Sequence, residues 1–111
     1  MSERAKAVPR SISRALVDVG VHLATWRRLQ RLTAEQVADR AGISRNTLHR
    51  LESGGGASLE NTLRVARALG VLDVLTDALD PYKTDVGRLR ADEELPARVR
   101  PRTAAPEDGR G

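Results

Sequence analysis

Four polar side chains between Gly42 and Gly56 could form directional hydrogen bonds to nucleobases. They are Arg45, Asn46, His49 and Arg50. If this stretch is a helix, Leu48 and Leu51 lie on its buried face and the four polar side chains point away. Arg and Asn suit bidentate contacts to guanine and adenine edges, and an α-helix fits the major groove of DNA. The stretch therefore predicts a base-contacting helix. The alternative is a solvated helix face of a basic protein.

The preceding residues predict a second short helix that would position this one. Thr33 to Gln36 has the capping-box pattern, and a helix over 34–41 would bury Val37, Ala38 and Ala41. Gly42 is placed to end that helix, and Ser44 is placed to cap the next one. Two short helices joined by a glycine-containing turn of this length form a helix-turn-helix.

The helix starts offer a second kind of contact, to DNA phosphates. The first backbone N–H groups of a helix favour anions, and here they belong to Ala34 and Glu35 beside the Thr33 hydroxyl. Ser44 and Thr47 add hydroxyls near the start of the next helix. We expect these five residues to contact phosphates while the four polar side chains of the base-contacting helix reach bases.

The rest of the chain predicts three further helices and two tails, an all-α fold with five helices. Apolar spacing predicts a helix from Ser13, its N-cap, to Leu32 with Trp26 in the core. It also predicts one over 58–69 that Ser58 caps and whose apolar stripe includes Leu59, and one over 72–79. The last has apolar residues on more than one face. Residues 1–12 form a flexible basic arm, residues 13–80 the domain, and residues 81–111 a mostly disordered extension in which 84–95 could form a weak helix.

Composition narrows the function. Residues 1–32 carry seven Lys and Arg against two acids, whereas residues 71–111 carry seven against nine, which suits a protein offering one side to a polyanion. The chain has no Cys, and its two His lack metal-ligand spacing, so we expect no metal site and no cofactor. Without an apolar leader or span, we expect a cytoplasmic location and no membrane contact. A bundle this small has little room for a catalytic pocket, so we do not expect an enzyme.

The run from Trp26 to Gly54 resembles the Cro/C1-type helix-turn-helix family of bacterial and phage regulators. The matching residues are Leu32, Thr33, Val37, Ala38, Ala41, Gly42, Ile43, Ser44, Leu48, Leu51, Glu52 and Gly54. The resemblance implies a compact lambda-repressor-like domain and an ion pair between Arg27 and Glu52. The chain departs from the family at Ala34, where Gln is usual, and at 54–57, where a Lys or Arg is often found. Both departures remove expected phosphate contacts, and the basic arm (Arg4, Lys6, Arg10, Arg14) could replace them.

The resemblance further implies a transcriptional regulator, usually a repressor, that binds an inverted-repeat operator in double-stranded DNA as a homodimer. We expect the dimer surface at Leu72, Leu75 and Leu79. The segment over 86–102 loosely resembles antitoxins that pair with high-persistence-type kinase toxins. The alternative function is thus an antitoxin that binds a toxin protein and represses the shared operon. A domain that kept the fold and lost DNA binding is a third interpretation.

Overall fold

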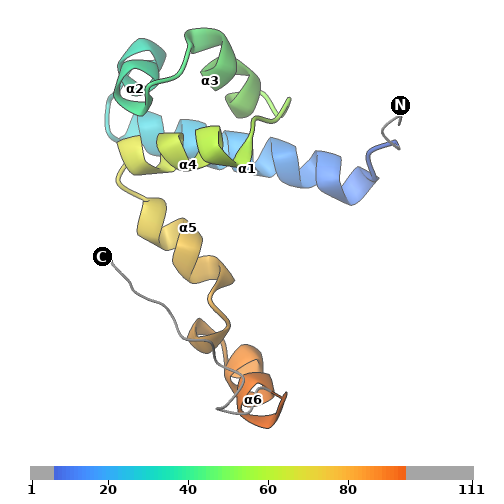
Figure 1. The fold of residues 1–111 in the computed structure, drawn as a ribbon. Helices are drawn as coiled ribbons and strands as arrows, with labels where there is room; N and C mark the ends of the chain where they lie inside the picture. The colour runs from blue at the N-terminus through green and yellow to red at the C-terminus, as the bar shows by residue number, and fades with distance from the viewer. Residues whose placement is uncertain (1–6, 95–111) are drawn as a thin grey trace. The chain divides into compact units, whose positions relative to one another are not determined.

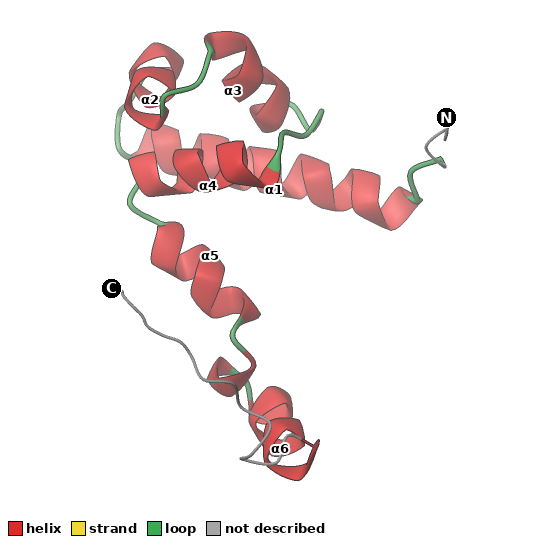
Figure 2. Ribbon diagram, viewed as in Figure 1, coloured by secondary structure: helices red, strands yellow, loops and turns green. Residues whose placement is uncertain are grey.

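The computed structural model describes residues 7–94, and every regular element among them is helical (Figures 1 and 2). The elements are α1 (Arg10–Leu29), α2 (Ala34–Ala41), α3 (Arg45–Glu52), α4 (Leu59–Ala68), α5 (Leu72–Leu79), the 3-10 helix η1 (Pro81–Lys83) and α6 (Asp85–Glu94). The all-α prediction is confirmed for this part of the chain. The predicted number of helices was too low by one, because the segment over 84–95 forms α6.

The chain divides into two compact units, with the boundary after Asp73. The first unit contains α1 to α4, and the second contains most of α5 together with η1 and α6. Four of the five helices expected in one bundle therefore lie in the first unit, and most of α5 belongs to the second. None of the residues of α5 is buried.

Helix α1 begins earlier than the sequence predicted. Its first residue is Arg10 and its N-cap is Pro9, whose carbonyl accepts from Ile12 N (3.0 Å) and Ser13 N (3.1 Å). Ser13 is thus a helical residue and not the cap. Proline suits this place because its fixed backbone angle leads into the helix and it has no N–H to satisfy. Arg10 and Arg14 consequently belong to α1, while Arg4 and Lys6 lie outside the described residues.

The predicted caps of the next three helices are confirmed. Thr33 Oγ1 accepts from Gln36 N (3.0 Å) and Gln36 Oε1 accepts from Thr33 N (2.9 Å), which completes the capping box of α2. Ser44 and Ser58 cap α3 and α4 by accepting from the backbone N–H three residues on, at 3.0 Å in each case. These side chains satisfy donors that a helix start leaves unpaired.

The core of the first unit joins α3 to α1 and α2 to both α3 and α4. Its buried apolar residues are Leu23, Ala24, Val37, Ala38, Ala41, Leu48, Leu51, Val65, Ala66, Leu69 and Val71. The closest approach of α1 and α3 is at Gly20, where an added Cβ would lie 2.4 Å from the Leu51 carbonyl oxygen. A glycine at that point allows α3 to rest directly on the backbone of α1.

Two apolar side chains that the sequence placed in the core lie at the surface. Trp26 is 40% exposed on α1, and Leu59 is 72% exposed at the start of α4. The periodicity of α1 identifies an apolar stripe, but the stripe is wider than the surface that α3 covers, so Trp26 stays at its uncovered edge. Leu59 is the first residue of α4, where the helix has no neighbouring turn before it.

The second unit is small. Helix α6 packs on η1, and Ala91 is buried there. Asp80 caps η1 by accepting from Tyr82 N (2.9 Å), and Thr84 Oγ1 accepts from Gly87 N (2.9 Å) at the start of α6. Residues 95–102 of the segment that resembles antitoxins lie outside the described residues. Among residues 7–94, no helix combines the length and the apolar character that crossing a membrane requires.

Candidate DNA-binding surface

The turn between α2 and α3 is closed by hydrogen bonds that fix the two helices. Gly42 has a φ of 73°, in the left-handed region, and its N–H donates to the Asp39 carbonyl (3.2 Å). Ile43 N donates to the Ala38 carbonyl (3.0 Å), so the chain reverses tightly after α2. Ser44 then starts α3 in extended backbone. This is the helix-turn-helix geometry that the sequence predicted.

The four predicted base-contacting side chains share the outer face of α3. Leu48 and Leu51 are buried, whereas Arg45, Asn46, His49 and Arg50 are exposed. Within residues 7–94, no side-chain hydrogen bond or ion pair occupies any of the four. Their donors and acceptors are therefore available to a ligand without breaking an internal bond.

The predicted phosphate-binding residues lie at the starts of α2 and α3. Thr33 and Glu35 are exposed and Ala34 is half-buried, and the first N–H groups of α2 have no backbone partner because they precede the first helical turn. At α3, Ser44 Oγ donates to Thr47 Oγ1 (2.9 Å) while accepting from Thr47 N. The Ser44 proton is thus engaged inside the turn, and of these two hydroxyls only Thr47 keeps a proton that it can donate outward.

Arg27 on α1 and Glu52 at the end of α3 form a two-point ion pair. Arg27 Nε donates to Glu52 Oε2 (2.8 Å) and Arg27 Nη2 donates to Glu52 Oε1 (3.0 Å). A third donor, Arg27 Nη1, reaches the Leu32 carbonyl (3.1 Å). The hydrogen bond to Glu52 raises the pKa of Arg27, and partial burial opposes this less strongly. The pair joins the helix that would contact bases to the longest helix of the unit.

The glycines after α3 are explained by how the helix ends. Gly55 N donates to the Arg50 carbonyl (2.8 Å) and Gly54 N donates to the Leu51 carbonyl (3.3 Å). Gly54 has a φ of 91°, and an added Cβ would lie 2.8 Å from Val17 Cγ2 on α1. The loop therefore ends α3 and packs on α1, and it offers no cationic side chain to a phosphate.

Sequence reasoning missed two exposed arginines next to the start of α2. Arg28 and Arg31 have no side-chain partner within the part of the chain that the structure describes. Arg31 has a φ of 59° and is the one non-glycine residue with a positive φ among residues 7–94. The left-handed conformation costs a residue with a Cβ about 1–2 kcal/mol. Periodicity gave no signal for this, because the sequence predicted a helix that continues to Leu32.

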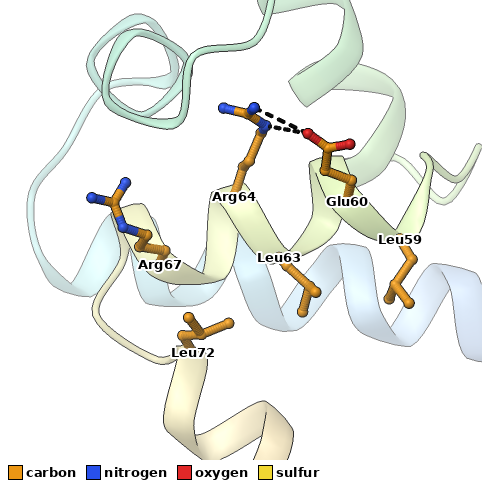
Figure 3. Close-up of a pocket in the computed structure, with 6 residues that line it drawn as sticks. All are labelled: Leu59, Glu60, Leu63, Arg64, Arg67 and Leu72. Carbon is orange, nitrogen blue, oxygen red and sulfur yellow. Dashed lines mark hydrogen bonds and ion pairs between the residues drawn. The ribbon is translucent and has the colours of Figure 1, made fainter. Parts of the chain in front are cut away.

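A groove beside α4 in the first unit includes Leu72, whereas the other two expected dimer residues, Leu75 and Leu79, belong to the second unit. Leu72 is half-buried and lines this groove with Leu59 and Leu63, and Arg67 stands at its edge (Figure 3). The groove has a volume of about 550 Å³, and most of its exposed lining is apolar although Glu60, Arg64 and Arg67 also line it. Leu75 is half-buried and Leu79 is 82% exposed on α5. Each of these surfaces is apolar and open to a partner.

The structure places no candidate metal site among the residues it describes. No group of three or more His, Asp or Glu side chains is arranged to hold a metal ion there. His22 and His49 are both exposed, on α1 and α3 respectively.

Residues 18–79 match the family of helix-turn-helix domains, and this match includes α2, α3 and the turn between them. No curated protein and no solved structure gives a significant match. The match spans more than half of the chain and begins within α1, ending at the last residue of α5. The chain therefore belongs to the helix-turn-helix domain family of DNA-binding proteins.

Proposed function

We propose that the protein is a sequence-specific transcriptional regulator that represses by binding an inverted-repeat operator in double-stranded DNA. The observation that carries this proposal is the outer face of α3. Arg45, Asn46, His49 and Arg50 project from it without a side-chain partner among residues 7–94. Leu48 and Leu51 fix the helix to the core. A helix of this kind enters the major groove with its N-terminal residues leading.

Phosphate contacts orient such a helix in the groove. Thr33, Ala34, Glu35, Ser44 and Thr47 surround the two helix starts, and the backbone N–H groups of α2 supply the main anion contact. The Glu35 carboxylate is exposed and carries the wrong charge for a phosphate, so only its backbone belongs to the contact. The Ser44 hydroxyl would have to leave Thr47 before it could donate.

The proposed operator has two half-sites because the protein acts as a homodimer. An apolar surface at Leu72, Leu75 and Leu79 supports this, since Leu79 is largely exposed and α5 has no buried residue. Two copies of α3 would then enter successive major grooves about 34 Å apart.

The test is the joint substitution of Arg45, Asn46 and Arg50 by Ala. An operator is first selected from a random duplex library with the wild-type protein, and binding is then measured by fluorescence anisotropy. Each lost base contact should weaken operator binding by about 1–3 kcal/mol, so the triple variant should bind the operator no better than unrelated DNA. Helicity by circular dichroism serves as the folding control. Unchanged operator affinity in the folded triple variant would overturn the proposal.

A further inference from the structure

The first four helices end in the same hydrogen-bonding pattern, and one of them uses an unusual residue for it. In each, a left-handed residue donates three residues back and the next residue donates five residues back, at 2.8–3.3 Å. The left-handed residue is Gly42 after α2, Gly54 after α3 and Gly70 after α4, with φ between 73° and 91°. After α1 it is Arg31, with a φ of 59°.

The C-terminus of α1 favours a nearby cation, but this does not explain why the left-handed residue itself is arginine. Glycine is the residue that adopts the left-handed conformation without strain, and the same chain uses it at the three equivalent places. A residue with a Cβ restricts the unfolded chain more than glycine does, and this restriction favours folding. At a positive φ, however, the strain in the native state exceeds the stability gained in this way. The Arg31 side chain is exposed and forms no hydrogen bond or ion pair with any residue from 7 to 94. Within residues 7–94, only the interaction of this cation with the C-terminus of α1 offsets part of the strain.

The charge of Arg31 lies between two helix ends, the C-terminus of α1, which favours a cation, and the start of α2, which does not. Arg31 lies two residues before Thr33, the N-cap of α2, and the start of a helix carries a partial positive charge. Arg28, three residues earlier, is exposed and without a side-chain partner in the described chain. A cation in this place becomes favourable once an anion lies between it and the helix start.

We propose that Arg31 binds a backbone phosphate of duplex DNA at the corner between α1 and α2. Ala34, the first residue of α2, ends in a methyl group and offers no side-chain donor, whereas Arg31, three residues before it, is exposed and carries a guanidinium. This inference rests on the proposed DNA binding and names a contact that supports it. In this chain Arg31 supplies the side-chain contact to phosphate that Ala34, which contacts phosphate only through its backbone, cannot make.

The decisive substitution is Arg31→Gly, because it separates a binding role from a structural one. Removing the cation should weaken binding to a labelled mixed-sequence duplex about tenfold at low salt. It should also reduce the slope of log K against log salt by about one. The same substitution relieves the left-handed strain, so the melting temperature should rise. A residue with only a structural role cannot move stability and binding in opposite directions in this way.

Two further variants complete the experiment. Arg31→Lys should keep the wild-type salt slope, because a phosphate accepts either cation. Lys83→Gln removes an exposed cation from η1, outside the helix-turn-helix, and should leave both slope and affinity unchanged. If Arg31→Gly binds with the wild-type affinity and slope, or melts at a lower temperature, the inference is wrong.

The failure of this inference can be distinguished from a failure of the proposed function. If the wild-type protein binds no duplex at low salt, both the regulator proposal and the Arg31 contact are wrong. If it binds, and the α3 triple variant loses its operator preference while Arg31→Gly changes nothing, only the Arg31 contact is wrong.

Discussion

Individual polar side chains differ in whether the fold already uses them. Arg45 and Asn46 are exposed and engage no residue from 7 to 94, so binding a base edge costs no internal bond. Ser44 already donates to Thr47 and must exchange that bond for one to a phosphate, which lowers the net gain. We therefore expect base contacts from α3 to contribute more to affinity than the Ser44 hydroxyl does.

Arg27 and Glu52 show the opposite case, polar groups that the fold uses fully. Their side chains are 15% and 14% exposed, and two hydrogen bonds join them. Since the pKa of Arg27 is raised, the stability that this shift contributes is complete below the pKa of unfolded arginine. It is lost only as the pH rises through the higher folded value, so Arg27 causes no pH dependence near neutrality.

We predict that Glu52→Gln lowers the free energy of unfolding by about 1–3 kcal/mol, because hydrogen bonds between charged groups lose their charge assistance. The matched control is Glu60→Gln, which breaks the exposed pair of Glu60 with Arg64 on α4 (3.0 Å) and should cost less than about 0.5 kcal/mol. Urea unfolding followed by circular dichroism measures both. Equal effects for the two variants would show that the Arg27–Glu52 pair has no special structural role.

At the scale of helices, the sequence predicted what local chemistry determines. Thr33, Ser44 and Ser58 were identified as caps because their side chains bond to backbone three residues away. Trp26 and Leu59 were misplaced because their burial depends on which part of a helix a neighbouring helix covers, and spacing along one helix does not contain that information. The left-handed backbone of Arg31 was missed because arginine rarely adopts a φ such as 59°, so the residue type gave no sign of it.

The contact between α1 and α3 at Gly20 gives a prediction about elements. In Gly20→Ala the new methyl group would meet the Leu51 and Glu52 carbonyl oxygens at 2.4 and 2.7 Å, so the two helices must separate. We expect a loss of about 1–3 kcal/mol in the free energy of unfolding, even though alanine favours helices more than glycine does. The control, Val21→Ala on the exposed side of α1, should change stability by less than about 0.5 kcal/mol. Thermal melts of a Gly20→Ala protein as stable as the wild type would contradict the direct contact.

At the scale of the whole molecule, the expected single bundle is replaced by two units. The first unit holds every residue proposed to contact DNA, and the second holds Leu75 and Leu79 of the expected dimer surface. Charge follows the same division, because residues 1–32 are basic and residues 71–111 carry more acids than bases. The proposed DNA contacts thus lie in the first unit, together with Leu72, whereas the other two expected dimer residues lie in the second.

We predict that Leu79→Asp converts the proposed dimer to a monomer. Leu79 is largely exposed, so the substitution leaves the fold intact, and a carboxylate in an apolar interface cannot be solvated. Sedimentation velocity should show the molar mass fall to that of one chain, and operator binding should lose its dependence on the second half-site. Val86→Asp on α6, at an equally open valine, is the control and should stay dimeric. A Leu79→Asp protein that remains a dimer would move the interface elsewhere.

Gly20 has no space for a side chain, and this affects how mutants at that position behave in a genetic screen. A genetic screen for loss of repression scores every position by phenotype and does not separate folding from recognition. Gly20 is not among the residues proposed to contact DNA, yet any other amino acid there would place a Cβ against the backbone of α3. Substitutions at Gly20 would therefore abolish repression as often as substitutions at Arg45. The two classes of mutant would differ only in how much protein accumulates in the cell.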